Sequence, residues 1–287
     1  MWLVDGNWLT SRLADPLVRV VDVRFAPAGL TARERFLAGH VPGAQHCDLE
    51  RDLSDLSKKG RHPWPSTEHF ARTLSKLGIG QSTHVVVCDD GTGAIAARLW
   101  FMLRAHGFPR VSLLDGGFAR WKADGHPVET GEGQPVAPAE PMKLTLDSSR
   151  VVTRDEIEAL VQQRNTANSS APLLLDARAP DRYRGENETI DPKAGHIPGA
   201  QSFPFMGNVK SAEDPRFRTP DELRARFLTL GATQRPLIFY CGSGVTACQN
   251  AFAHAMAGFA DGRVYIGSWS EWISEPQAPI ATGSEPG

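Results

Sequence analysis

The stretch LIFYCGSGVTAC, residues 237–248, predicts a buried strand, a tight loop and the start of a helix. Four apolar, β-prone residues run into Cys241 at the turn. A cysteine in this place is expected to meet converging backbone N–H groups and the positive end of a helix, and both favour a thiolate. The loop therefore predicts an activated thiol at Cys241. The plainer alternative is an inert cysteine buried in the core.

The residues that follow the cysteine suit an anion. Gly242 and Gly244 let the backbone curl without a Cβ penalty. Ser243 and Thr246 add hydroxyl donors. Together with Val245, these residues are expected to line a substrate-binding loop.

The totals describe a globular protein with room for two domains in 287 residues. Lys and Arg number 31 against 33 Asp and Glu, so the balance favours neither nucleic acid nor an anionic membrane as a partner. The N-terminus lacks a basic leader, and no apolar run is long enough to cross a bilayer, so we expect a cytoplasmic protein. Four cysteines without regular spacing predict neither a disulfide framework nor a zinc site. We expect no metal and no organic cofactor.

The sequence contains an internal repeat, with one copy in each half. Short motifs recur in the same order in both halves, at near-constant spacing. VVDVR at 20–24 matches LLDAR at 174–178, and GHVPGA at 39–44 matches GHIPGA at 195–200. Each copy alternates short apolar strands with helical stretches. This pattern predicts an α/β fold with two tandem domains, each a mostly parallel sheet with helices on both faces.

The two copies differ at the cysteine. In the first copy the strand VVVC runs into DDGTG, so Asp89 or Asp90 stands where Cys241 stands in the second. A carboxylate cannot act as a sulfur nucleophile, and the first domain is therefore expected to be catalytically silent. A stretch rich in Pro, Gly and Glu separates the copies. The predicted organisation is a silent domain at 1–128, a linker at 129–149, a catalytic domain at 150–278 and a tail at 279–287.

Two copies of D-x-R, GH-[IV]-PGA and a closing tryptophan motif, with one cysteine loop, resemble the tandem rhodanese-domain sulfurtransferases over nearly the whole chain. The loop CGSGVTA looks like that of the 3-mercaptopyruvate sulfurtransferases, whereas thiosulfate-preferring relatives usually carry basic residues after the cysteine. The resemblance implies that Cys241 takes sulfane sulfur from 3-mercaptopyruvate as a persulfide and releases pyruvate. The acceptor would be cyanide or a thiol such as thioredoxin or glutathione.

Three alternatives accompany this hypothesis. Thiosulfate could be the donor. The chain could be a non-catalytic interaction module, although the loss of the cysteine that marks that fate is seen only in the first copy. A related phosphatase activity is disfavoured because Ala247 occupies the position where those enzymes need a phosphate-binding arginine.

Arginines in the segment DRYRG are candidates for holding the donor. Arg182 and Arg184 could each bind a planar carboxylate through two parallel hydrogen bonds. Arg182 matches the substrate-binding arginine of the family. Its plain alternative is an ordinary surface arginine, or one paired with Asp181, Glu186 or Glu188. The family commonly has a second arginine just before GHIPG, but ENETIDPKA at 186–194 contains none. Lys193 or Arg184 could replace it.

The resemblance also implies a relay beside the loop serine. By motif its members are His62 in RHPWP, Glu50 in CDLERD and Ser243, which would polarise the donor carbonyl or protonate the departing enolate. The plain alternative for His62 is a loop histidine between prolines. Cys248 is expected to be a core residue rather than a resolving thiol.

Overall fold

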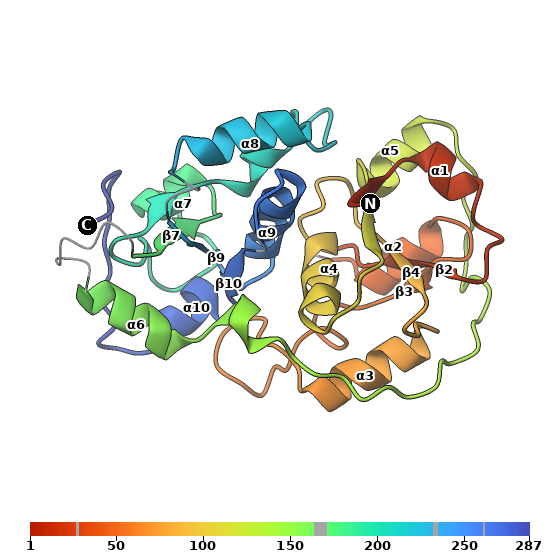
Figure 1. Cartoon of the computed structure of the whole chain (residues 1–287), viewed down its shortest axis with the longest axis horizontal. Coiled ribbons are helices and arrows are strands. Elements are labelled where there is room, and N and C mark those ends of the chain that lie inside the picture. Colours follow the sequence, from red (N-terminus) through yellow and green to blue (C-terminus); the bar gives the residue numbers. More distant parts are fainter. Residues whose placement is uncertain (27–28, 164–170, 232–234, 261) are drawn as a thin grey trace. The chain divides into compact units, whose positions relative to one another are not determined.

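The computed structural model describes residues 1–26, 29–163, 171–231, 235–260 and 262–287. The chain divides into two compact units, each built on one five-stranded sheet (Figure 1). Each unit comes mainly from one half of the sequence and includes a short segment of the other half. Unit 1 holds Met1–Asp55, Trp64–Asp147 and Val209–Phe217, and unit 2 holds Leu56–Pro63, Ser148–Asn208 and Arg218–Gly287.

Unit 1 carries a parallel sheet in the strand order β1-β5-β4-β2-β3. Its strands are β1 (Leu3–Val4), β2 (Val18–Asp22), β3 (Gln45–His46), β4 (His84–Cys88) and β5 (Val111–Leu114). Its helices are α1 (Gly6–Thr10), α2 (Ala32–Ala38), α3 (Thr67–Lys76), α4 (Ala96–Ala105) and α5 (Gly117–Ala123). Residues of α1, α2 and α5 share one apolar core with Val20 and Val86, and α4 packs on β4 and β5. The central strand β4 contains a run of four fully buried apolar residues, 85–88, because both of its faces are covered.

Unit 2 repeats this plan with a parallel sheet in the order β6-β10-β9-β7-β8. Its strands are β6 (Val151–Val152), β7 (Leu173–Asp176), β8 (Gln201–Ser202), β9 (Leu237–Tyr240) and β10 (Arg263–Tyr265). Its helices are α6 (Arg154–Gln163), α7 (Pro180–Arg184), α8 (Pro220–Leu228), α9 (Thr246–Met256) and α10 (Ser268–Trp272), with 3₁₀ turns at Ser148–Arg150 and Phe205–Asn208. The predicted fold class is confirmed.

Backbone pairing fixes the equivalence of the two loops. The residue before Asp89 pairs with the D-x-R aspartate at the end of β2, just as the residue before Cys241 pairs with that of β7. The N–H of Phe118 donates to the carbonyl of Asp89 at 2.8 Å, and that of Trp269 donates to the carbonyl of Cys241 at 2.9 Å. Asp89 is therefore the equivalent of Cys241, a choice that the sequence left open between two aspartates.

The last residues of the chain belong to unit 2 and form hydrogen bonds with its GHIPGA turn. His196, in the second GHIPGA turn, exchanges backbone hydrogen bonds of 2.8 and 3.0 Å with Ala281. The Gly199 N–H donates to the carbonyl of Pro286 at 2.6 Å. The helices described here include none that is both long and apolar enough to cross a membrane.

Candidate active site

Cys241 is the first residue after β9 and lies under the start of α9. It is 2 % exposed. The Gly244 N–H donates to its Sγ at 3.1 Å, and its own N–H donates to the Oγ of Ser268 at 3.1 Å. Ser268 is the one described non-glycine residue with a positive φ, 54°. The thiol is thus held at the mouth of a short loop, with a backbone donor directed at the sulfur.

A Cβ at either loop glycine would meet a neighbouring atom, which belongs to the backbone at Gly244 and to the end of an arginine side chain at Gly242. Gly244 has a φ of 72°, and a Cβ there would lie 2.1 Å from the carbonyl oxygen of Ile266. A Cβ at Gly242 would lie 2.6 Å from Nη2 of Arg61. The two remaining residues of the predicted loop follow at the helix: Val245 precedes α9, and Thr246 is its first residue.

His62 and Ser243 meet in unit 2. The Nδ1 of His62 lies 2.8 Å from the Oγ of Ser243, and both residues are buried. The short segment 56–63 carries His62 into this unit. Glu50 is an exposed residue of unit 1, where its N–H donates to Asp48 at 2.9 Å. Its part in a relay stays a prediction.

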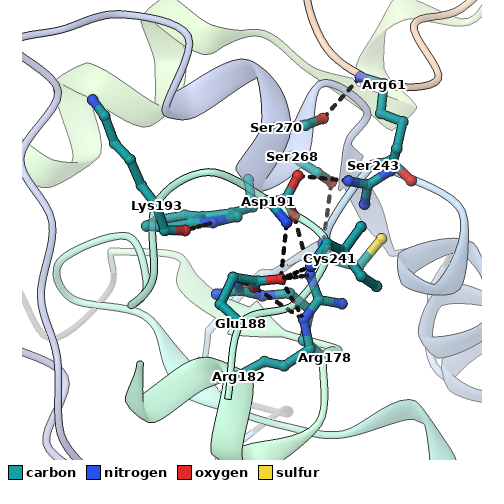
Figure 2. Close-up of polar contacts among 12 residues, drawn as sticks. Arg61, Arg178, Arg182, Glu188, Asp191, Lys193, Cys241, Ser243, Ser268 and Ser270 are labelled. Carbon is teal, nitrogen blue, oxygen red and sulfur yellow. Dashed lines mark hydrogen bonds and ion pairs between the residues drawn. The ribbon is translucent and has the colours of Figure 1, made fainter. Parts of the chain in front are cut away.

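Arg182 projects from α7 toward two buried carboxylates (Figure 2). Its Nε and Nη2 lie 3.0 and 2.9 Å from Glu188, and Nη2 also lies 3.0 Å from Oδ2 of Asp191. The other oxygen of Asp191 accepts from Nη1 of Arg61 at 2.5 Å. One carboxylate thus bridges two guanidinium groups beside the cysteine loop.

Further buried residues, with Arg178 among them, hold Arg182 and Glu188 in place. Arg178 is 2 % exposed, donates to Asp176 at 2.7 Å and stacks over the ring of Trp269 at 4.7 Å. Although burial opposes ionisation of Glu188, hydrogen bonds from the backbone of Asp191 and Ile190 and from Arg182 keep its pKa below the usual value. These hydrogen bonds therefore keep Glu188 as a carboxylate next to Arg182.

The two other cations considered for the donor lie elsewhere. Arg184, two residues after Arg182 on α7, projects from a different side of the helix and pairs with Glu186 at 2.6 Å. Lys193 contributes its carbonyl, which accepts from the indole N–H of Trp269 at 3.0 Å. Figure 2 shows its amino group pointing away from the cysteine.

Cys248 lies in α9 and is fully buried, with its Sγ donating to the carbonyl of Gly244 at 3.2 Å. It packs as the expected core residue. The described residues gather no cluster of three or more His, Cys, Asp or Glu side chains that could hold a metal ion.

The loop of the first copy encloses a carboxylate in place of a thiol. Asp89 is 3 % exposed, and its two oxygens accept four backbone N–H groups of the loop and of the start of α4. The donors are those of Gly91 at 2.9 Å, Gly93 at 3.1 Å, Ile95 at 3.0 Å and Ala96 at 3.2 Å. Burial raises the pKa of Asp89, whereas the four N–H groups favour its carboxylate form, so a loop of this design directs backbone donors at the group that it encloses.

Sequence reasoning missed Arg61 and Asp191, whereas Glu188 was one of three acids expected as alternative partners of Arg182, and it does pair with that arginine. Arg61 directly precedes His62, so the motif that selected the histidine could also have drawn attention to its neighbour. Asp191 lies in the segment 186–194 that contains no arginine. No local pattern links Arg61 to Asp191, because their contact depends on segment 56–63 packing in unit 2.

Comparison with known proteins gives consistent results. The rhodanese-like domain family matches residues 5–124 and again 153–275. The chain is 44 % identical to a probable 3-mercaptopyruvate sulfurtransferase of Pseudomonas aeruginosa, over 98 % of both chains. It is 38 % identical to a thiosulfate sulfurtransferase of Cricetulus griseus, over 98 % of this chain and 95 % of that one. The crystal structure of SseA from Escherichia coli, described among 3-mercaptopyruvate sulfotransferases, superposes with a TM-score of 0.81 at 32 % identity, covering 94 % of this chain and all of that one.

Proposed function

The chain belongs to the rhodanese family and is a sulfurtransferase, as the sequence predicted, and we propose that its donor is 3-mercaptopyruvate and its nucleophile Cys241. The observation that carries the proposal is the thiol of Cys241, held by a backbone N–H of its loop in the unit where Arg182 and Arg61 meet. A sulfur nucleophile, an anion-tolerant loop and a carboxylate anchor are what this reaction requires.

The proposed reaction has two steps. The Cys241 thiolate attacks the sulfur of the donor, the carbon–sulfur bond breaks, and its electron pair leaves on carbon as the enolate of pyruvate. The enolate takes up a proton to give pyruvate. The thiol proton of the donor leaves the outer sulfur and replaces the proton that was given to the enolate, so the persulfide is left ionised on the enzyme. In the second step cyanide or a thiolate attacks the outer sulfur, which restores the Cys241 thiolate.

The charge around the anchor supports a donor with a single negative charge. Arg61, Arg178 and Arg182 are matched by three buried or nearly buried carboxylates, those of Asp176, Glu188 and Asp191. The loop adds no basic side chain, since Gly242 and Ser243 follow the cysteine. A balanced cluster attracts a dianion such as thiosulfate less than an uncompensated one would.

Unit 1 contains an internal analogue of the proposed anchor. Phe36 stacks on His40 as Tyr183 stacks on His196, so Arg35, the residue before Phe36, is the equivalent of Arg182. Arg35 binds the Asp90 carboxylate through two hydrogen bonds of 2.8 and 2.5 Å.

The position of that carboxylate matters because Asp90 is the equivalent of Gly242. In unit 1, the arginine at the position of Arg182 thus binds the carboxylate carried by the second residue of the loop. Gly242 leaves the corresponding space without a side chain, and we place the donor carboxylate there, beside Arg182.

His62 and Ser243 would supply the proton that the enolate needs. Their contact of 2.8 Å lets a proton pass between the imidazole and the hydroxyl. Ser243 belongs to the cysteine loop, so its hydroxyl is next to the place where the enolate forms. We include Glu50 in this relay on the family resemblance alone.

Thiosulfate remains the second candidate donor. The similarity to a thiosulfate sulfurtransferase favours it, as does the lack of an arginine in residues 186–194. We further propose that the protein works in the cytoplasm, where its four free, buried cysteines suit a reducing environment.

The donor is tested by steady-state transfer of sulfur to cyanide, with 3-mercaptopyruvate and with thiosulfate in parallel. We expect the wild-type protein to prefer 3-mercaptopyruvate in kcat/KM. Arg182→Gln should raise the KM for 3-mercaptopyruvate by about 10- to 100-fold, because a charged, paired hydrogen bond to the carboxylate is lost.

Arg184→Gln is the matched control, since it removes the same charge from the same helix on a side that faces Glu186. It should leave the KM unchanged. A preference for thiosulfate in the wild type would reject the proposed donor, and no activity with either donor would favour the non-catalytic alternative.

His62→Asn should lower kcat with 3-mercaptopyruvate by about 10²-fold, the usual contribution of a positioned proton donor. With thiosulfate the effect should be small, because sulfite leaves as a stable anion and needs no proton. Stopped-flow kinetics of persulfide formation with each donor measures this contrast. Ser243→Ala combined with His62→Asn should cost no more than either change alone if the two act as one unit. Equal losses with both donors would contradict the protonation role.

A further inference from the structure

We propose that Arg61 binds the donor carboxylate together with Arg182, so that a residue from the first half of the sequence completes the donor site. The inference rests on the proposed function and adds a residue that selects donors bearing a carboxylate. It starts from the position of Arg61 in unit 2, where segment 56–63 lies.

Both the backbone and the side chain of Arg61 are fixed. Its N–H donates to the Oγ of Ser270 at 2.9 Å, and the N–H of Ser270 donates to the carbonyl of Gly242 at 2.9 Å. Its Nη1 is held by Asp191 at 2.5 Å. Two independent connections therefore join this arginine to the cysteine loop and to the partner of Arg182.

The outer edge of the guanidinium faces the space over the loop. A Cβ at Gly242 would lie 2.6 Å from Nη2 of Arg61 and 3.6 Å from Nη2 of Arg182. Both arginines therefore approach one small volume beside the cysteine, whose edge is also reached by Oδ2 of Asp191 at 3.7 Å. The hydrogen bond from Arg61 to Asp191 uses Nη1, and Nη2 is the atom nearest to Gly242.

The arginines and the acids of this cluster differ in solvent exposure. The side chains of Arg61 and Arg182 are 30 % and 17 % exposed, whereas those of Asp191 and Glu188 are 4 % and 2 % exposed. The buried acids bind the arginines on the side away from solvent, and the arginines are accessible to a solute on their exposed side. Two guanidinium groups aligned by a shared carboxylate are preorganised for a planar anion.

In unit 1, the residue equivalent to Gly242 carries a side chain. There the equivalent residue, Asp90, fills this volume with its own carboxylate and satisfies Arg35. In unit 2 the side chain is absent and a second arginine stands at the same volume. In the second copy Asp191 and Glu188 bind the arginines from the side, and we assign the space over Gly242 to the carboxylate of the donor.

The experiment compares Arg61→Gln, Arg61→Lys and the wild type in sulfur transfer from 3-mercaptopyruvate to cyanide, with pyruvate as a competitive inhibitor. We expect Arg61→Gln to raise both the KM for the donor and the inhibition constant of pyruvate by about 10- to 100-fold. The kcat should change by less than about 3-fold, because the reacting atoms are untouched. The KM and the pyruvate inhibition constant of Arg61→Lys should lie between those of the wild type and Arg61→Gln, since lysine keeps the charge and lacks the planar guanidinium group.

Lys59→Gln is the matched control. It removes the same charge two residues away, from a side chain that pairs with Glu275 on the surface of unit 2. Its KM should equal that of the wild type. Persulfide formation with thiosulfate, together with the melting temperature, shows that each variant is folded and that Cys241 reacts.

Unchanged KM and pyruvate inhibition in a folded Arg61→Gln would overturn the inference. So would a loss confined to kcat, which would assign Arg61 a purely structural role in holding segment 56–63. Failure of the proposed donor looks different, because the wild type itself would then not turn over 3-mercaptopyruvate. A double-variant cycle with Arg182→Gln should show non-additive losses, as expected for two groups on one carboxylate.

Discussion

Cys241→Ser is expected to abolish sulfur transfer from every donor, with kcat reduced by more than about 10⁴-fold. Oxygen cannot carry the sulfane sulfur as a persulfide, and the serine hydroxyl in this loop would accept the Gly244 N–H that now meets Sγ at 3.1 Å. The variant should still fold, since the loop contacts of the backbone at residue 241 remain. Intact-protein mass spectrometry after incubation with donor should show one added sulfur atom on the wild type and none on the variant.

Cys248→Ala controls for the general effect of losing a buried thiol. Cys248 is fully buried on α9 and touches the same loop through the carbonyl of Gly244. The variant should lose some stability, about 1–2 kcal/mol for a small buried side chain, and keep the added sulfur atom. Persistence of persulfide in Cys241→Ser, or its loss in Cys248→Ala, would move the nucleophile to the second cysteine.

The fold could be predicted because its determinants are local and repeated. The apolar run before Cys241 and the alternation of strands with helices indicate a parallel sheet, and the D-x-R and GH-x-PGA motifs mark the same unit twice. The glycine loop predicted a thiol close to backbone donors, and the structure places Gly244 N–H on the sulfur. Family resemblance added His62, which is found against Ser243.

The remaining parts of the site depend on packing that no local pattern encodes. Segment 56–63 lies in the first half of the sequence and packs in unit 2, and only this packing brings Arg61 to Asp191. The choice between Arg182 and Arg184 depends on helix phase, since residues two apart on a helix point in different directions. Likewise, strand register was needed to show that Asp89 is the equivalent of Cys241.

Gly244→Ala is expected to damage both stability and activity. The new Cβ would lie 2.1 Å from the carbonyl oxygen of Ile266, and the residue would keep a φ of 72° that side chains disfavour. The two penalties together should lower the free energy of unfolding by about 2–5 kcal/mol. Relief of the clash requires the loop or the backbone after β10 to move, and that backbone carries Ser268, whose Oγ accepts from the N–H of Cys241.

Gly258→Ala separates the two penalties. Gly258 has a similar φ of 79°, but the nearest atom to a Cβ there is the flexible end of Arg224 at 3.9 Å. This control should lose about 1 kcal/mol and keep wild-type kcat. Urea denaturation and sulfur transfer to cyanide, measured on both variants, test the difference. If the two variants lose the same stability and Gly244→Ala keeps its activity, the close approach of Gly244 to Ile266 does not shape the cysteine loop. If only Gly244→Ala loses activity, the position of the thiol depends on that contact, because the two glycines have similar positive φ angles.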